Sequence, residues 1–246
     1  GVFRNPTSSR GPVRIARRYN TGTPLASPLQ LTQLRQAPKN DAGAASAGGW
    51  TVSYPIARFY LTSDYDISRV IKGGWQLAGG HGQVHLEDAL EDMLQYVKAG
   101  ITTFDCADIY TGVEELIGAF LRRHKHAFGT DELPSVQIHT KYVPDLSALS
   151  RLSRQDVEKV IDRSLTRLGL DRLDLVQFHW WDYDTPRYVE AALHLKALQG
   201  AGKIRHIGVT NFDVMHLKDI TDAGVTIVSN QVQYSVLDQR PEGEMT

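Results

Sequence analysis

Five consecutive segments with the apolar pattern of buried strands end in polar or ionisable side chains. In chain order these are Asp105, Lys141, His179, the pair Thr210–Asn211 and the pair Asn230–Gln231. A buried strand end does not need such groups for packing. In a parallel α/β barrel the carboxyl ends of the strands meet at one mouth, where enzymes of that fold keep their chemistry. The sequence therefore predicts a pocket in which a carboxylate, an ammonium, an imidazole and several amides lie together.

Tyr110 extends this set, because it lies five residues after Asp105 on the loop that leaves the strand. A free tyrosine has a pKa of about 10, too high for easy proton donation at neutral pH. An ammonium within hydrogen-bond reach favours the phenolate and lowers such a pKa, and Lys141 is the candidate. Asp105 can hold the ammonium in place, and His179 can hydrogen-bond a substrate oxygen or relay a proton. We expect Tyr110 to be the general acid toward a carbonyl that is being reduced.

Two further groups of residues complete the predicted site. The amides of Asn211 and Gln231 have donors and acceptors that suit a flat carboxamide such as that of nicotinamide. Trp75, Trp181 and Tyr183 fall on loops after strands, and we expect them to wall a substrate pocket. Packing alone would also account for each of these three aromatic side chains.

Each ionisable residue has a simpler explanation when it is taken alone. Asp105 can cap the following loop, Lys141 can be a solvated charge, and His179 can be a satisfied, partly buried histidine. Their joint occurrence at consecutive strand ends favours catalysis. In the same region, Asp108 is expected to be a loop or capping residue and Cys106 a packed side chain.

A metal site is not predicted. His81 and His85 have the four-residue spacing that a metal could use, but no cysteine or carboxylate partner for a metal site is evident.

Strand and helix patterns alternate from about residue 57. Strands over 57–62 and 67–72, separated by the polar turn 63–66, predict a hairpin whose second strand runs on into Gly73. The elements expected after it are a helix from Leu86 closed by Gly100, strand 101–105, helix 113–124, strand 136–141, a helix opened by Ser153 and ended at Gly169, strand 174–179, helix 187–200, strand 204–208, helix 213–223 and strand 226–231. Such alternation predicts a parallel sheet with helices outside it.

The spacing of these strands favours a barrel over a doubly wound sheet. Strand starts between 101 and 226 recur about every 31 residues, which is typical of a (β/α)8 barrel. A dinucleotide-binding doubly wound fold needs G-x-G-x-x-G after its first strand, and the nearest stretch, Gly80–His85, lacks the third glycine. A complete barrel needs about 250 residues. We therefore expect residues 51–246 to form an incomplete α/β TIM-type barrel with about six of its eight βα units, a fragment or truncated form, after an N-terminal hairpin.

Residues 1–50 have a different composition from the rest of the chain. The first 40 residues carry seven basic residues and no acidic one, and the stretch is rich in Arg, Ser, Ala and Pro without sustained apolar periodicity. This pattern predicts a disordered transit-peptide-like segment for a mitochondrion or plastid. The alternative is a basic tail without an address, which would leave the protein in the cytoplasm.

Charge and composition exclude several classes of partner. Residues 41–246 retain 20 basic and 28 acidic residues, a net charge of −8, whereas a nucleic-acid partner needs a basic face. No apolar run approaches the roughly 20 residues of a membrane span. The single cysteine, Cys106, excludes an intramolecular disulfide and fits a reducing compartment.

Over about residues 66–240 the chain resembles the aldo-keto reductase family. The matching stretches are GGWQLAGG, GITTFDCADIYTGVEELIG, HTKYV, RLGLDRLDLVQFHWWDY, GKIRHIGVTNF and VSNQVQYSVLD. The resemblance implies reduction of a small aldehyde or ketone by hydride transfer from NADPH, without a metal. It implies a catalytic tetrad of Asp105, Tyr110, Lys141 and His179, and nicotinamide contacts from Thr210, Asn211 and Gln231.

The incomplete barrel leaves a second function open. In this family the last two units hold the aromatic side chain that stacks on nicotinamide and the basic residues that grip the adenosine phosphate. The alternative is therefore a catalytically inactive truncated barrel that acts as a binding or regulatory protein. The sequence does not predict the natural substrate, the preference for NADP over NAD, or the oligomeric state.

Overall fold

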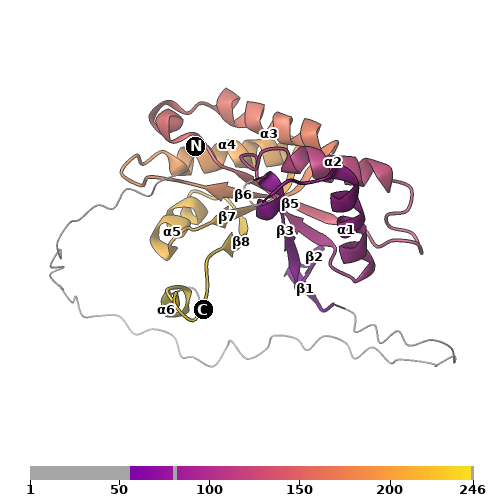
Figure 1. The fold of residues 1–246 in the computed structure, drawn as a ribbon. Coiled ribbons are helices and arrows are strands. Elements are labelled where there is room, and N and C mark those ends of the chain that lie inside the picture. The colour runs from indigo at the N-terminus through magenta and orange to yellow at the C-terminus, as the bar shows by residue number, and fades with distance from the viewer. Residues whose placement is uncertain (1–55, 80–81, 245–246) are drawn as a thin grey trace. The chain divides into compact units, whose positions relative to one another are not determined.

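The computed structural model describes residues 56–79 and 82–244 (Figure 1). The chain divides into two units, residues 1–50 and 51–246. The predicted transit segment and the pair Gly80-His81 lie outside the described residues, so the structure does not test the predictions made for them. All the described helices and strands belong to the second unit.

An antiparallel hairpin precedes the main sheet, as predicted. Its strands are β1 (Arg58–Thr62) and β2 (Tyr65–Ser68). The predicted strand 67–72 was wrong in its extent, because β2 ends at Ser68 and a separate strand begins at Ile71. Ser68 explains the break: its hydroxyl donates to the carbonyl of Val70 at 2.7 Å and accepts from the backbone N–H of Thr103 at 3.1 Å, which turns the chain away from the hairpin.

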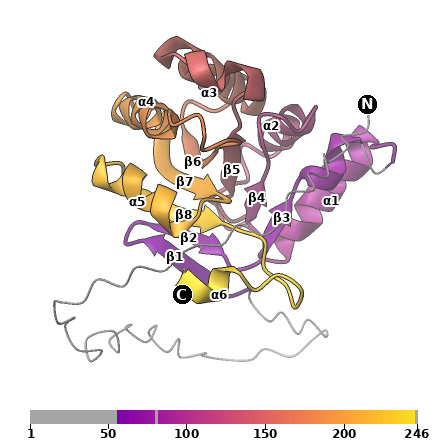
Figure 2. The same cartoon turned by 90° about the vertical axis from the view of Figure 1, so that its left-hand side faces the viewer.

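Six parallel strands form the main sheet in the order β3-β4-β5-β6-β7-β8. The strands are β3 (Ile71–Gly73), β4 (Thr103–Asp105), β5 (Gln137–Tyr142), β6 (Leu173–His179), β7 (Ile204–Thr210) and β8 (Ile227–Gln231). The helices are α1 (Leu86–Lys98), α2 (Val113–Arg123), α3 (Arg154–Leu168), α4 (Tyr188–Gly200), α5 (Val214–Asp222) and the short α6 (Pro241–Glu244). Short 3-10 helices span Trp75–Ala78 and Leu146–Arg151. In Figure 2 the strands lie at the centre and α1 to α5 surround them on the outer side.

This arrangement confirms the incomplete (β/α)8-type barrel with an N-terminal hairpin. Consecutive strands are neighbours, and β3 and β8 are the two edges of the sheet within the described residues. Helix α3 also begins as predicted: the Ser153 side chain accepts from the Asp156 N–H, and Asp156 accepts from the Ser153 N–H. This reciprocal capping satisfies two backbone donors that a helix start otherwise leaves unpaired.

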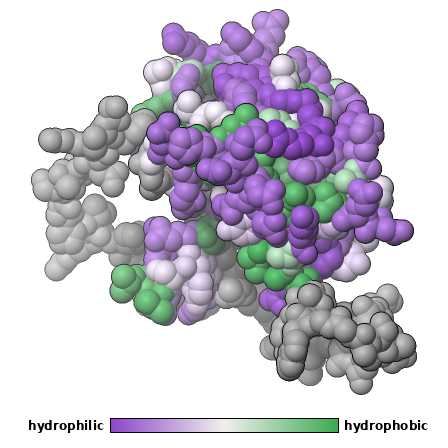
Figure 3. Space-filling model, turned by 45° about the vertical axis from the view of Figure 1, so that its right-hand side comes forward, coloured by the Kyte–Doolittle hydropathy of each residue, from purple (hydrophilic) through white to green (hydrophobic). Residues whose placement is uncertain are grey.

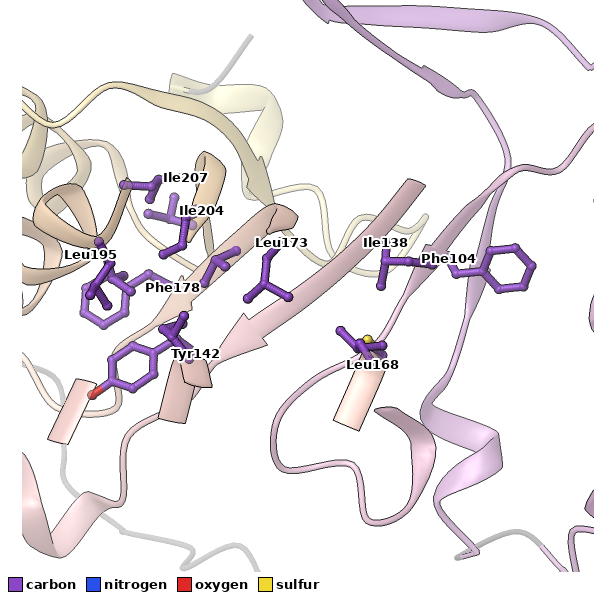
Figure 4. Close-up of a cluster of buried hydrophobic side chains, with 14 of the residues drawn as sticks. Phe104, Ile138, Tyr142, Leu168, Leu173, Phe178, Leu195, Ile204 and Ile207 are labelled. Atoms are coloured by element: carbon purple, nitrogen blue, oxygen red, sulfur yellow. The ribbon is translucent and has the colours of Figure 1, made fainter. Parts of the chain in front are cut away.

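The main apolar core fills the layer between the strands and the outer helices. Figure 4 shows part of it, with Phe104, Ile138 and Phe178 of the strands near Leu168 of α3 and Leu195 of α4. Side chains of a strand alternate between its two faces. Ile138 and Tyr142 of β5 therefore face the helices, and the intervening Lys141 faces the inside of the barrel, where it lines a pocket at the carboxyl ends of the strands.

The surface seen in Figure 3 is mainly hydrophilic, with scattered hydrophobic patches. No helix among residues 56–79 and 82–244 combines the length and the apolar character that crossing a bilayer requires.

Candidate active site

Strand register places the predicted residues at the carboxyl ends of neighbouring strands. Asp105 pairs with Gly73 of β3, and Lys141 pairs with Gln177 of β6. His179 pairs with Thr210, and Thr210 in turn pairs with Gln231 of β8. Since parallel strands point the same way, the carboxyl ends of all six strands lie around one opening.

A pocket of about 490 Å³ lies at this opening. Eight of the ten predicted site residues line it: Trp75, Tyr110, Lys141, His179, Trp181, Thr210, Asn211 and Gln231. Asp105 lies beneath them as the partner of Lys141. Tyr183 does not line the pocket.

Lys141 and Asp105 form a largely buried ion pair. The Lys141 Nζ donates to Asp105 Oδ2 at 2.6 Å and to the Cys106 carbonyl at 3.0 Å, and the lysine is 7% exposed. The other carboxylate oxygen, Oδ1, accepts from Gln177 Nε2 at 2.8 Å and from Gln231 Nε2 at 3.3 Å. Because the carboxylate has a donor on both oxygens, its orientation toward Lys141 is fixed.

Tyr110 lies beside this ion pair. The Lys141 Nζ is 5.0 Å from the centroid of the Tyr110 ring. The Trp75 ring meets the Tyr110 ring edge-on at 5.1 Å. Gly74 permits this approach: its N–H donates to the Asp105 carbonyl at 2.7 Å, and a Cβ at this position would come within 2.8 Å of the same oxygen. A side chain at residue 74 would therefore push Trp75 away from the pocket.

His179 lines the pocket, and one of its ring nitrogens has no hydrogen-bond partner among the described residues. Its Nδ1 is 3.4 Å from the Thr210 carbonyl, and its Nε2 is buried without a hydrogen-bond partner among the described residues. Burial lowers the pKa of His179, although the contact with the Thr210 carbonyl opposes that shift. The Trp181 ring meets the imidazole edge-on at 4.4 Å and is held by a 2.7 Å hydrogen bond from its Nε1 to the Pro144 carbonyl.

Thr210, Asn211 and Gln231 meet through backbone contacts. The Gln231 carbonyl accepts from the Asn211 N–H at 2.9 Å and from the Thr210 hydroxyl at 3.1 Å. Asn211 has a left-handed backbone conformation, φ 60°, which few residues other than glycine adopt readily and asparagine tolerates. Asn211 is exposed and lies at the rim of the pocket. Asn230, from the same strand end, instead donates to the Phe212 carbonyl at 2.8 Å.

Two residues, Tyr183 and Gln177, differ from what the sequence pattern predicts. Tyr183 stacks on His216 at 3.6 Å and packs edge-on against Tyr188, so it belongs to an aromatic cluster of α4 and α5. Gln177, which the sequence analysis missed, is 3% exposed and binds Asp105. Its position two residues before His179, on the same face of β6, is the signal that could have found it. Cys106 is fully buried as predicted, and burial raises the pKa of its thiol.

A second pocket, of about 520 Å³, adjoins the first. The two share Asn211, Val232 and Gln233, and the second also reaches Asp213 and Arg240. The two pockets are therefore neighbours that meet at these three residues.

Comparison with known proteins identifies the family. The sequence pattern of the aldo/keto reductase family matches residues 69–246. The NADH-specific methylglyoxal reductase of Escherichia coli K12 is 28% identical over 207 residues, which cover 75% of this chain and 60% of that enzyme. The chain belongs to the aldo/keto reductase family, as its sequence motifs predict.

Solved structures agree with this assignment. A thermostable aldo-keto reductase, Tm1743, crystallised with the inhibitor epalrestat, superposes with a TM-score of 0.63 at 28% identity over 76% of this chain and 65% of its own. A Bombyx mori aldo-keto reductase in complex with NADP has the same fold, with a TM-score of 0.59 at 20% identity over 73% of this chain and 59% of its own. The chain thus spans about 60% of the length of the relatives it matches.

Proposed function

We propose that this chain reduces an aldehyde or ketone with a hydride from NADPH and that Tyr110 is the general acid. One observation carries the proposal. The Lys141 ammonium, paired with Asp105 at 2.6 Å, is 5.0 Å from the centroid of the Tyr110 ring, in a pocket that His179 also lines. A phenol beside a fixed ammonium can give up a proton to a carbonyl oxygen that is gaining negative charge.

The ion pair has a defined role in this reaction. Two N–H bonds of the Lys141 ammonium point to Asp105 and to the Cys106 carbonyl, among the contacts of the described residues. An ammonium has three N–H groups, so one is left for the Tyr110 oxygen. That N–H stabilises the negative charge on the phenol oxygen as its proton leaves. Asp105 keeps the ammonium from turning away.

His179 would bind the substrate oxygen. Its Nε2 is a buried polar atom with no partner in the described part of the chain, and a buried polar atom without a partner is costly. Nδ1 faces the Thr210 carbonyl and so carries the proton of the neutral ring, which leaves Nε2 as an acceptor that a hydroxyl of the substrate or product would satisfy. The indoles of Trp75 and Trp181, about half exposed, would flank the substrate.

The residues present also fit the cofactor, which supplies a hydride when it is bound. Thr210, Asn211 and Gln231 would hold the nicotinamide carboxamide, because Gln231 gives its Nε2 to Asp105 and so keeps its side-chain oxygen for an amide N–H. The second pocket, of about 520 Å³, continues from Asn211 and would take the part of the cofactor next to the nicotinamide. The Bombyx relative in complex with NADP supports NADPH, whereas the E. coli relative is NADH-specific, so both reductants should be tested.

The test is turnover by the full chain with NADPH, using methylglyoxal and an aromatic aldehyde as substrates, followed by the loss of NADPH absorbance. Tyr110→Phe should lower kcat by at least about a hundredfold, since general acid catalysis contributes about that much. The control is Tyr60→Phe, an exposed tyrosine of the hairpin, which should behave as wild type.

Normal turnover in Tyr110→Phe would refute the role of Tyr110. Titration with NADPH followed by fluorescence separates the other outcomes. Binding without turnover of any carbonyl would favour the alternative, a catalytically inactive barrel that acts as a binding or regulatory protein. Absence of both binding and turnover would contradict the reductase proposal.

A further inference from the structure

Asp108 is a buried carboxyl group that the proposed chemistry does not use. It lies two residues before Tyr110 and is 5% exposed. Burial raises the pKa of Asp108 to about 7, and Glu114 adds to the rise, while Arg163, the Val143 N–H and Arg167 oppose it. A carboxylate kept in such a place costs folding free energy at neutral pH, so fold stability does not explain it.

The contacts of Asp108 join the loop that carries Tyr110 to the strand that carries Lys141. Its N–H donates to the Lys141 carbonyl at 3.3 Å, and its Oδ1 accepts from the Val143 N–H at 3.2 Å. One residue thus bonds to the backbone of the strand that carries Lys141 through both its main chain and its side chain. Because Tyr110 follows two residues later, these bonds fix the start of its loop against the end of β5.

A buried network supports this junction from the side of α3. Arg167 Nη1 donates to the Asp108 carbonyl at 3.1 Å and to Glu114 Oε2 at 3.2 Å. Glu114 is fully buried and accepts from the Thr140 hydroxyl of β5 at 2.7 Å. Gly118 lets α2 and α3 approach closely enough, since a Cβ there would lie 2.2 Å from the Arg167 carbonyl. The loop is therefore anchored on both sides of Tyr110.

We propose that Asp108 is a positioning residue, which clamps the loop of Tyr110 to the end of β5 and so holds the phenol beside the Lys141 ammonium. The inference rests on the proposed reductase function. Its physical basis is that a displacement of about 1 Å between reacting groups can cost about a hundredfold in rate.

The chain offers a matched control, a carboxylate that bonds to the amino end of β5. Asp174 of β6 is a half-buried carboxyl group, and its Oδ2 accepts from the Ile138 N–H at 2.9 Å. Asp108 and Asp174 thus make the same kind of bond to β5, one at the carboxyl end and one at the amino end. Only the first is near the proposed chemistry.

The experiment compares Asp108→Ala, Asp108→Asn and Asp174→Ala in the full chain. Asp108→Ala should lower kcat at least tenfold with KM for the aldehyde changed less than threefold. Asp108→Asn, whose amide oxygen can still accept from Val143, should recover most of the loss. Asp174→Ala should not show this loss of kcat. Should Asp108→Ala not fold, Asp108→Ser, too short to reach Val143, takes its place.

Amide hydrogen exchange gives a second readout that does not need activity. In Asp108→Ala the amides of Val143 and Tyr110 should exchange at least tenfold faster, whereas Asp174→Ala should speed Ile138 alone. An equal loss of kcat in Asp108→Ala and Asp174→Ala, or unchanged exchange at Val143 and Tyr110, overturns the clamp. If the wild-type chain reduces no carbonyl, the reductase proposal fails, and the exchange pattern alone decides for or against the clamp.

Discussion

Both ends of the barrel bury polar side chains, but those at the amino ends of the strands face one another and those at the carboxyl ends face a pocket. At the amino ends the Tyr65 hydroxyl and His139 Nε2 form a 2.9 Å hydrogen bond, and the Tyr65 ring lies 4.6 Å from that of His206. The hairpin covers this end, where Arg205 of β7 donates to the Asp64 carbonyl at 2.6 Å and Arg58 donates to Thr102.

The carboxyl ends lack such a cover among the described residues. His206 at the amino ends and His179 at the carboxyl ends each have a buried ring nitrogen without a hydrogen-bond partner in the described part of the chain, but His179 lines an open pocket together with Tyr110 and Lys141. The two ends use similar residue types, namely tyrosine, histidine and a cation. The difference shows that polar groups inside a barrel form a binding site only where the surrounding elements leave open space for a ligand beside them.

The largest expected effect on stability lies at the closed end. Tyr65→Ala should lower the free energy of unfolding by about 3–5 kcal/mol, because it removes a buried aromatic side chain and leaves His139 without its partner. Thermal melts would measure this loss, with Tyr60→Ala, an exposed residue of the same hairpin, as control. If Tyr65→Ala keeps wild-type stability but loses turnover at a temperature where it is folded, the closed end is not purely structural and the contrast between the two ends is wrong.

The two ends should also respond to pH in opposite directions. Burial lowers the pKa of His139 to about 3 from 6.5, so the folded state binds fewer protons there than the unfolded state. This stability is present above pH 6.5 and is lost as pH falls from about 6.5 toward 3. Burial raises the pKa of Asp108 to about 7 from 3.8, so stability from this group is present below pH 3.8 and is lost as pH rises through 7.

Single substitutions separate these two contributions. Wild type should lose free energy of unfolding as pH falls from 6 to 4, and His139→Gln should make this loss smaller by about 1–3 kcal/mol. Asp108→Asn should raise the free energy of unfolding relative to wild type, and this gain should be about 1–3 kcal/mol larger at pH 8 than at pH 5. The charged and titratable groups that face Asp108 are Glu114 of α2, Tyr142 of β5, and Arg163 and Arg167 of α3. Denaturant unfolding across pH measures both effects. Parallel stability curves for wild type and Asp108→Asn would contradict the assignment.

The smallest effect compares two glutamines inside the barrel. Gln177→Leu removes the 2.8 Å donor to Asp105 at the open end and should lower kcat about tenfold through looser placement of Lys141. Gln137→Leu removes the acceptor of the Thr102 hydroxyl at the closed end and should cost about 1 kcal/mol of stability with kcat unchanged. Equal loss of kcat in the two variants would mean that the effect of a glutamine on catalysis does not depend on which end of the barrel it occupies.

Much of this structure could be predicted from local sequence patterns. Strand–helix alternation, the capping box at Ser153 and the polar strand ends at Asp105, Lys141 and His179 are set by residues close together in the chain. The end of β2 was harder to predict, because Ser68 ends the strand by binding Thr103, 35 residues away. The prediction for Tyr183 differed from the structure for a related reason: its neighbours Tyr188 and His216 come from two helices, and only their packing decides which way its loop turns.

The sequence by itself determined the family, the order of the barrel elements and the residue types at the carboxyl ends of the strands, because these depend on periodicity and spacing. Only the tertiary structure decided that Gln177 fixes Asp105 and that Asp108 joins the Tyr110 loop to β5. Those contacts depend on the register between strands and on the direction of side chains in loops. Neither is encoded in the spacing of residues along a single segment.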